Sequence, residues 1–379
     1  MQTEQFRWTD EAGWQGGFPG HLGKSAQLVL VFGGRELLLQ RQCFDEISAA
    51  YPSAKIFGCS TAGEICDTQV LENSLSIAAI KFDSTTISTV RAKHSEFKNS
   101  YEAGTAIGKM LLNDKLSHVF VLSTSINVNG SALMRGITHV LPDGVELSGG
   151  IASNYEVVGE TAVVCDAIPD NNSAVAIGFY GDQLSVGCAS VGGWDAFGPE
   201  RMITKSHENV LYELDGKSAL DLYKKYLGEH AGGLPATALF FPMCLRPPES
   251  TGIVVRSITS VNEKDQSLIS GGDLPVGHYA RMMLGNYDHL VEGAEDAAKI
   301  CSGIIGNQGP DLAIVVSCVA RKMVLRQKVE EETEAVREML GERPVITGFY
   351  SLGEIAPIAS GTPCEFHNQS MTITVFREN

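Results

Sequence analysis

The stretch GCSTAGEI at residues 58–65 recurs near the other end of the chain as GFYSLGEI at residues 348–355. Both copies open with glycine and close with Gly-Glu-Ile, but the two residues after the first glycine are Cys-Ser in one copy and Phe-Tyr in the other. Glycine accepts positive φ and lets another part of the backbone approach closely. The recurrence therefore predicts one tight turn, built twice.

The sequence around the first copy predicts a complete structural unit. The apolar run AQLVLVFGG (residues 26–34) is typical of a buried strand, RELLLQRQCFDEISAAYP has apolar residues at helical spacing, and AKIFG is a second strand. After the turn, SLSIAAIKF (residues 74–82) alternates as a half-buried strand does. The predicted unit is strand–helix–strand–glycine turn–strand.

The same order of elements occurs twice more. The phrase GFYSLGEI follows the strand DLAIVVSCV and the charged helix VLRQKVEEETEAVREML. The strand HNQSMTITVF comes after it and closes the unit. A looser copy has the strand SHVFVLSTS, the helix NGSALMRGITHVLP, the glycine turn VELSGGIASNYE (residues 145–156) and the strand NNSAVAIGFY. Thirty residues separate Leu28 from Gly58, and thirty separate Val119 from Gly149. Fixed spacing of this kind indicates an internal repeat.

These units predict an α/β fold with mixed β-sheets flanked by helices and two domains. AGGLPA at residues 231–236 combines glycine and proline after the predicted helix GKSALDLYKKYLGEH, which is typical of a linker. We expect one domain at residues 1–230, with a short N-terminal extension at residues 1–25, and a second domain at residues 231–379.

Composition excludes several classes of protein. The net charge of −16 and the pI near 5.0 disfavour nucleic acid and anionic membrane surfaces, which require a basic face. The longest apolar runs are too short to span a bilayer, and the N-terminus lacks the basic start and apolar core of a secretory signal. Nine cysteines without a CxxC pattern fit neither a disulfide framework nor a zinc site. A cytoplasmic protein is expected.

Taken together, several phrases make the chain resemble the FIST sensory family over nearly its whole length. They are GCSTAGEI, SGG at residues 148–150, NVLYELDGKSALDLYKKYLG, SCVARKMVL, GFYSLGEIAP and FHNQSMTITVF. The resemblance implies an N-terminal FIST domain followed by a C-terminal one. The chain departs from the family pattern at Ser153-Asn154, where Gly-Asp is usual, and at Glu208, where glycine is more usual.

The resemblance implies an intracellular sensor of small ligands, with amino acids as one class. A subset of the family binds haem through a histidine, senses nitric oxide and acts with a histidine kinase. We expect this chain to belong to that haem-based subset, with haem b as cofactor, because no output domain is attached to it. The alternative is a non-haem sensor of a small polar ligand such as an amino acid. The expected partner is a histidine kinase or another signalling protein, with self-association as a further option.

Glu64 and Glu354 follow the turn glycine in both copies and are the most informative polar residues. In one interpretation each carboxylate accepts hydrogen bonds from backbone N–H groups and closes its own turn. In the other, both line a pocket between the domains and hold a cationic or hydroxylated ligand group. Both interpretations stay open at this stage.

Catalysis by Cys59 or Ser60 is not expected. A nucleophilic thiol needs an activating base or a positive environment, and Phe349 and Tyr350 stand at the corresponding positions of the second copy. A catalytic pair would not differ so freely between copies, so we expect a binding site and no enzyme.

Arginine at the end of a strand is suited to capturing a carboxylate, including a haem propionate. Arg321 ends the strand AIVVSC, and Arg281 lies in GHYARMML; Arg321 is the better candidate because ligand sites of α/β proteins gather at the carboxyl ends of strands. The predicted ligand-binding residues are Cys59, Ser60, Thr61, Gly63, Glu64, Arg321, Tyr350, Ser351, Gly353 and Glu354.

A haem protein needs one neutral imidazole that faces an apolar slot. The chain has no CxxCH, so haem would not be attached covalently. His278 lies among Tyr279, Met282 and Met283, and His367 opens the phrase FHNQS. The candidates for a single axial ligand are His278, His367, His289 and His230.

Overall fold

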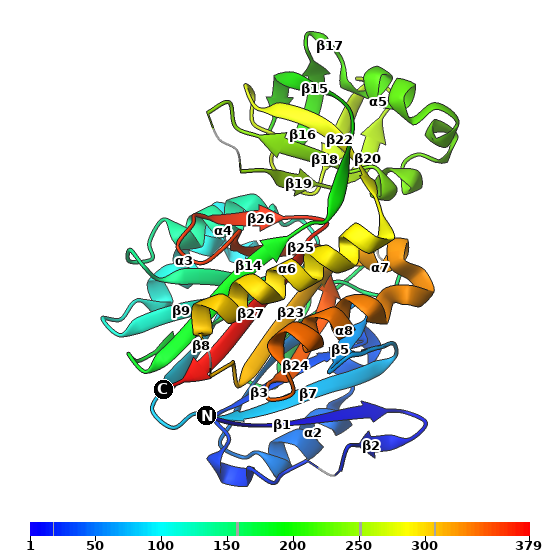
Figure 1. Ribbon diagram of the computed structural model, residues 1–379. Coiled ribbons are helices and arrows are strands. Elements are labelled where there is room, and N and C mark those ends of the chain that lie inside the picture. The colour runs from blue at the N-terminus through cyan, green and yellow to red at the C-terminus, as the bar shows by residue number, and fades with distance from the viewer. Residues whose placement is uncertain (18, 157–158, 250–251, 307) are drawn as a thin grey trace.

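The predicted repeats form three β-sheets, which together with their helices make up a three-sheet body. The computed structural model describes residues 1–17, 19–156, 159–249, 252–306 and 308–379. Residues 194–285 leave this body and form a separate inserted unit, which Figure 1 shows above the three sheets. The expected α/β class with mixed sheets and flanking helices is confirmed.

Each of the three units has the predicted order of elements. In the first unit, β3 pairs in parallel with β4 and antiparallel with β7. The first unit comprises β3 (Leu28–Gly33), α1 (Arg35–Leu38), α2 (Arg41–Ala50), β4 (Lys55–Ser60), β5 (Glu64–Cys66) and β7 (Ser74–Lys81). The second comprises β9 (Leu116–Ser123), α4 (Gly130–Thr138), β10 (Glu146–Ile151), β11 (Val163–Cys165) and β13 (Ser173–Tyr180). The third comprises β23 (Leu312–Cys318), α7 (Val319–Leu325), α8 (Val329–Leu340), β24 (Val345–Ser351), β25 (Gly353–Pro357) and β27 (Met371–Glu378).

The charged helix predicted at residues 324–340 is divided in the structure. Arg326 has φ 54°, which ends α7, and a short 3-10 turn, Arg326–Lys328, precedes α8. A left-handed residue cannot continue an α-helix, so the helical spacing read from the sequence crosses a real break.

The units exchange strands in a closed ring. After the glycine turn of each unit, the next strand leaves its own sheet and pairs with the neighbouring unit: β5 with β24, β25 with β10, and β11 with β4. The sheet orders are accordingly β12-β11-β4-β3-β7-β1-β2, β26-β25-β10-β9-β13-β8 and β14-β27-β23-β24-β5-β6. The remaining strands are β1 (Gln2–Thr9), β2 (Gly13–Gln15), β6 (Gln69–Leu71), β8 (Thr86–Lys93), β12 (Ile168–Asp170), β14 (Leu184–Val191) and β26 (Cys364–His367).

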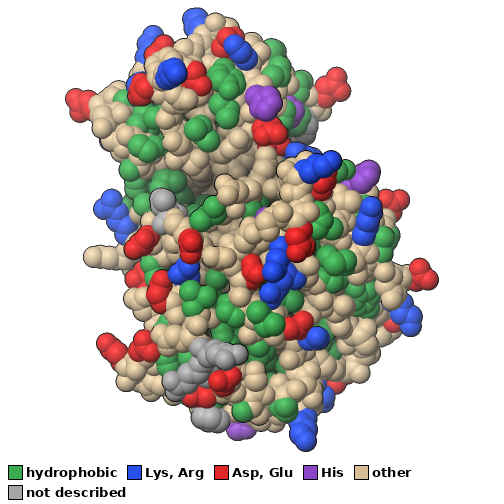
Figure 2. Space-filling model, turned by 180° about the vertical axis from the view of Figure 1, so that it is seen from behind, with side chains coloured by type: hydrophobic (Ala, Val, Ile, Leu, Met, Phe, Trp, Pro, Cys, Tyr) green, Lys and Arg blue, Asp and Glu red, His purple; other side chains and the backbone are tan. Residues whose placement is uncertain are grey.

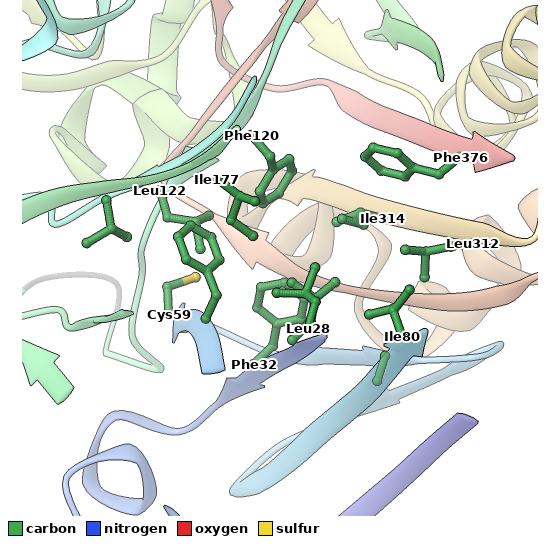
Figure 3. Packing of buried hydrophobic residues seen from close by; sticks show 14 of the residues in the cluster. Leu28, Phe32, Cys59, Ile80, Phe120, Leu122, Ile177, Leu312, Ile314 and Phe376 are labelled. Carbon is green, nitrogen blue, oxygen red and sulfur yellow. The ribbon is translucent and has the colours of Figure 1, made fainter. Parts of the chain in front are cut away.

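One apolar core lies where the inner faces of the three sheets meet. Figure 3 shows side chains of all three sheets directed into this interior, among them Leu28 and Phe32 of β3, Phe120 of β9 and Ile314 of β23. The Phe32 and Phe349 rings stack with their centroids 4.9 Å apart. Because strands of every unit bury their inner face in the same core, no unit has a complete core of its own.

Helices cover the outer face of each sheet. The first sheet packs against α1 and α2, the second against α4 and α3 (Ser100–Leu111), and the third against α8 and α6 (Tyr287–Ile305). Because its sheet is covered on both faces, β7 is buried on both sides, so the prediction of a half-buried strand at residues 74–82 is wrong. The same cover explains why other strands, such as β3 and β23, read as nearly continuous apolar runs. In the described part of the chain, no helix is long and apolar enough to cross a membrane.

The inserted unit has its own sheet and core. Its strands pair in the order β19-β18-β22-β15-β16-β21-β20, and α5 packs against them. Its elements are β15 (Trp194–His207), β16 (Val210–Leu214), β17 (Lys217–Ser218), α5 (Ala219–Leu227), β18 (Met243–Arg246), β19 (Val254–Arg256), β20 (Ile258–Asn262), β21 (Ser267–Ser270) and β22 (Tyr279–Gly285).

The predicted domains and the structural units divide the chain differently. The predicted boundary between residues 230 and 231, with the linker AGGLPA, falls inside the inserted unit, next to 3-10 turns that follow α5. Residues of the predicted N-terminal extension form β1 and β2, and β1 pairs with β7 at one side of the first sheet. The division at residues 230 and 231 stays a prediction about sequence domains.

The inserted unit contacts the three-sheet body through a second, polar connection. Asp273 accepts hydrogen bonds from Asn129 Nδ2 at 2.9 Å and from Arg135 Nη1 at 2.7 Å, both at or within α4. The face shown in Figure 2 narrows where the unit meets the body, and acidic and basic side chains are interspersed over it. The unit is therefore held both by its two chain connections and by an ion pair.

Candidate functional site

Glu64 sits in a cage of hydroxyl groups at the first glycine turn. Its side chain is fully buried. Thr61 Oγ1 donates a hydrogen bond to Oε1, and Ser74 Oγ donates one to Oε2 at 2.7 Å. Thr61 belongs to the turn and Ser74 begins β7, so the carboxylate joins the turn to the last strand of its unit.

Tyr155 provides the third hydroxyl group and comes from another unit. It lies in the segment between β10 and β11, and its hydroxyl donates to Glu64 Oε1 at 2.5 Å while accepting from Asn73 N at 2.6 Å. Gly34 allows this approach, because a Cβ atom there would lie 3.1 Å from Tyr155 Cε2. The exchange of β11 into the first sheet is what carries Tyr155 to Glu64.

Lys322 of the third unit completes the site. Its ammonium donates to Ala62 O at 2.7 Å, pairs with Glu72, and lies 6.0 Å from the centroid of the Tyr155 ring. Residues of all three units therefore meet around Glu64.

Burial raises the pKa of the Glu64 carboxyl from 4.5 to about 7, although the three hydroxyl donors and Lys322 act in the opposite direction. Taking a carboxylate out of water disfavours its charged form, whereas donors to that form favour it. The Glu64 carboxyl therefore keeps its proton to a higher pH than an exposed glutamate does.

Glu354 has a closely similar environment in the third unit. It is fully buried, accepts from Ser351 Oγ at 2.5 Å and from Ser370 Oγ at 3.0 Å, and burial raises its pKa to about 7. Ser351 and Ser370 occupy the positions of Thr61 and Ser74. In the second unit the equivalent residue is Val163, which pairs with Cys59 as Glu64 pairs with Phe349. Each glutamate binds a hydroxyl of its own turn. The backbone N–H donors that one interpretation expected are found at Glu354, which accepts from Ser370 N at 3.2 Å, whereas the donors to Glu64 among the described residues are side-chain hydroxyls.

A cavity of about 320 Å³ lies beside the Glu64 cage, on the side of Tyr155. The described residues that line it are Arg35, Glu36, Asn154, Tyr155, Glu156, Gly159 and Glu160. Arg35 pairs with Glu160 through its Nη2 atom. Two buried polar atoms of the lining residues, Arg35 Nε and Asn154 Oδ1, have no hydrogen-bond partner among the described residues. One is a donor and one an acceptor, and both are shielded from solvent.

The other predicted residues of the first phrase are buried inside the fold. Cys59 is fully buried in the central core, and burial raises the pKa of its thiol well above the usual value. Ser60 Oγ donates to Ser153 O at 2.7 Å and accepts from Ala162 N at 2.9 Å, which fastens the turn to the neighbouring unit. Gly63 has φ 158° and lies against Lys322 and Tyr350.

The predicted residues of the second phrase, and Arg321, lie in a different network. Arg321 is fully buried and donates to Glu332 Oε2 from Nε at 3.0 Å and from Nη2 at 2.8 Å. Tyr350 OH donates to Glu332 Oε1 at 2.5 Å. At Gly353 a Cβ atom would lie 2.3 Å from the Phe366 ring, so this glycine serves packing.

The four histidines considered for haem have separate environments. His367 is buried, its Nε2 lies 3.0 Å from Ala356 O, and burial lowers its pKa to about 4. His289 pairs with Asp195 at 2.7 Å, and this hydrogen bond raises its pKa. His278 is partly buried, which lowers its pKa, and its Nδ1 has no partner among the described residues. His230 is exposed and packs on the Phe241 ring at 5.3 Å.

The surroundings of these histidines do not single out one of them as an axial ligand for haem. Besides the cavity at Tyr155, larger cavities of about 550, 340 and 340 Å³ occur along the described chain, and none of the four candidate histidines lines them. Within the same residues, no group of three or more His, Cys, Asp or Glu side chains could hold a metal ion. Haem binding by one of these residues stays a prediction.

Sequence reasoning missed Tyr155, Lys322, Arg35 and Asn154. Asn154 and Tyr155 lie in the second unit, in the phrase SGGIASNYE. There the residues beyond the glycine turn differ from those of the first and third units. Lys322 directly follows Arg321. This difference of the second unit from the other two was a usable signal, because an insertion in one repeat commonly marks the binding face.

Comparisons with known proteins agree with the architecture. The model of the FIST N domain matches residues 27–217, and the model of the FIST C domain matches residues 219–357. No curated protein matches the chain. Among solved structures, cyanuric acid hydrolase from A. caulinodans is aligned over 100% of this chain and 99% of that chain, with 8% sequence identity and a TM-score of 0.32. A likeness at that level carries no argument about function.

Proposed function

The chain belongs to the FIST family, whose domains are sensory and bind small ligands, and on that premise we propose that it binds a small zwitterionic ligand such as an amino acid in the cavity beside Tyr155. The observation that carries the proposal is the Arg35 side chain, which is 22% exposed and lines the cavity together with Glu36, Glu156 and Glu160.

The charges around the cavity suit a ligand with both signs of charge. Arg35 supplies a guanidinium, which binds carboxylates well because its donors form a planar fork. Glu36, Glu156 and Glu160 place acceptors for an ammonium group around the same space. The volume of about 320 Å³ is at the small end of ligand pockets.

Glu64 acts behind the cavity wall in this proposal. Its hydrogen bond from Tyr155 holds the ring that forms part of the wall. A ligand that stabilises the Tyr155 ring in place therefore also stabilises the turn at Gly63 and Glu64.

Thermal-shift and calorimetric titration against the twenty common amino acids test the proposal. A ligand that binds the native state and not the unfolded state raises the melting temperature, and the rise continues with the logarithm of ligand concentration above Kd. Decarboxylated amines of the same side chains should give a much smaller shift, because they lack the group that Arg35 binds. If none of the amino acids binds, the proposed function is wrong.

Arg35→Gln sharpens this test. We expect it to weaken amino-acid binding by about tenfold or more, since charged hydrogen bonds contribute roughly 1.5–3 kcal/mol. Arg246→Gln is the matched control: Arg246 is 28% exposed and pairs with Glu200, while Arg35 is 22% exposed and pairs with Glu160. Equal effects of the two substitutions would contradict a binding role for Arg35.

We also propose that the chain is not an enzyme. Burial and the raised pKa of Cys59 support this, because a buried neutral thiol is a poor nucleophile. The finer expectations, namely haem-based sensing of nitric oxide and coupling to a histidine kinase, stay predictions. A Soret band in the absorption spectrum after reconstitution with haem, lost on substitution of one of the four histidines, is the result they require.

A further inference from the structure

The two chain connections of the inserted unit meet at one buried side chain. Gly192 lies just before β15 and Leu290 lies early in α6, which follows β22. Arg321 donates to Gly192 O from Nη1 and to Leu290 O from Nη2 at 2.6 Å. A single guanidinium therefore ties the segment entering the unit to the segment leaving it.

Tight packing restricts movement of these connections. A Cβ atom at Gly193 would lie 2.1 Å from His289 O, so the entering segment lies directly against α6. The Trp194 indole donates to Gln369 O at 2.6 Å. Displacement of the inserted unit would thus alter the contacts of Arg321.

The other side of Arg321 leads to the glycine turn at Glu64. Arg321 binds Glu332 Oε2, while Glu332 Oε1 accepts from Tyr350 OH at 2.5 Å and from Ser317 Oγ at 3.0 Å. The Tyr350 backbone pairs with the first turn, through Tyr350 N to Gly63 O at 2.9 Å and Ala62 N to Tyr350 O at 3.2 Å. The next residue after Gly63 is Glu64, which Tyr155 holds.

We propose that Arg321 is a positioning residue. Through Glu332 and Tyr350 it couples the attachment of the inserted unit to Glu64 and to the cavity beside Tyr155. This inference rests on the proposed function, because it gives the way in which ligand binding in the cavity affects the inserted unit. Arg321 makes no ligand contact in this role. The Arg321 guanidinium can donate to Gly192 O and Leu290 O only while both connecting segments keep their positions. Glu332, which orients Arg321, also orients Tyr350. Coupling between two sites is reciprocal, so a change at either end is felt at the other.

Hydrogen–deuterium exchange of the ligand-free protein, followed by mass spectrometry, tests the coupling from the cavity side. Tyr155→Phe removes the bond to Glu64, and we expect it to raise exchange at residues 192–194 and 286–290 by about threefold or more. Glu64→Gln perturbs the same bond and serves if Tyr155→Phe does not fold. An effect confined to the neighbours of Tyr155, such as residues 61–74, would overturn the inference.

Tyr350→Phe tests the route itself. It keeps the ring against Gly63 but removes the donor to Glu332, so we expect the same rise at residues 192–194 and 286–290, with no further rise in the double variant with Tyr155→Phe. Tyr223→Phe is the matched control, because Tyr223 is equally buried and donates to Phe241 O at 2.8 Å within the inserted unit. Additive effects, or an equal rise in Tyr223→Phe, would contradict the route.

These outcomes separate the two proposals. The exchange measurement needs no ligand, so a failure of amino acids to bind refutes the proposed function while the exchange data still decide the coupling. If amino acids bind but neither Tyr155→Phe nor Glu64→Gln changes hydrogen exchange at residues 192–194 and 286–290, the binding function stands and the coupling is wrong.

Discussion

Tyr155 and Glu64 are 91 positions apart in the sequence, and the Tyr155 hydroxyl donates a 2.5 Å hydrogen bond to the Glu64 carboxylate. The two residues belong to different repeated units. They meet because β11, which follows Tyr155 in the chain, crosses into the first sheet and pairs with β4. A contact between units thus joins the glycine turn to the wall of the cavity.

The first prediction concerns this bond. Tyr155→Phe should lower the free energy of unfolding by about 1–3 kcal/mol, because it removes a donor to a buried carboxyl group and leaves the Asn73 amide without its acceptor. Denaturant titration at neutral pH measures the loss. Tyr101→Phe, in which an exposed tyrosine of α3 loses the same atom, should change the stability little; equal losses would refute the assignment.

A second prediction concerns pH. The pKa of Glu64 is raised from 4.5 to about 7 in the folded chain, so the folded state binds more protons than the unfolded state between these values. Its contribution is fully present below about pH 4.5 and is lost as pH rises through about 7. The stability of the wild type relative to Glu64→Gln should therefore fall by roughly 2 kcal/mol between pH 5 and pH 8.

Denaturant titrations of the two proteins over that pH range provide the measurement. Glu354 remains in both and has a similarly raised pKa, so its contribution cancels in the difference. A difference that stays constant, or that grows with rising pH, would show that the Glu64 carboxyl is not protonated preferentially in the folded state.

A third prediction concerns the first glycine of each turn phrase. A Cβ atom at Gly58, Gly149 or Gly348 would lie 1.7, 1.8 or 1.8 Å from the carbonyl oxygen of Val31, Val121 or Val315. Alanine at any of the three should destabilise the protein by at least about 3 kcal/mol, because two paired strands would have to separate.

Gly303→Ala is the control for these substitutions. Gly303 lies within α6 and a Cβ atom there would have no neighbour within 4 Å. Alanine is favoured over glycine in a helix by about 1 kcal/mol, so this variant should be at least as stable as the wild type. Thermal unfolding of the four variants decides the matter, and tolerance of alanine at Gly58 or Gly348 would refute the close approach.

A fourth prediction concerns the cysteines. Cys66 and Cys364 are partly exposed, whereas Cys43, Cys59, Cys165, Cys188, Cys244, Cys301 and Cys318 are buried. A chromogenic disulfide reagent should modify at most Cys66 and Cys364 rapidly in the native protein, and all nine residues after denaturation. Rapid modification of Cys59, located by peptide mapping, would contradict its burial in the central core.

Much of the local structure could be predicted from the sequence. Apolar periodicity located the strands on either side of GCSTAGEI and GFYSLGEI, and the repeated glycines marked the turns, because both signals depend on residues close together in the chain. The hydroxyl cage of Glu354 also follows from local sequence, since Ser351 and Ser370 flank it as Thr61 and Ser74 flank Glu64. The helical break at Arg326 escaped prediction, because arginine is a good helix former and the local pattern does not mark its positive φ.

The sequence by itself thus determined the three units, their turns and the two turn glutamates. Only the tertiary structure decided which unit each exchanged strand pairs with, and hence that Tyr155, Arg35 and Lys322 gather near Glu64 while Arg321 is enclosed with Glu332. The physical reason is that strand pairing across units depends on how three sheets fill one common core. The hydrophobic effect is non-directional. An apolar pattern therefore predicts that a strand is buried, but it does not identify the strand with which it pairs.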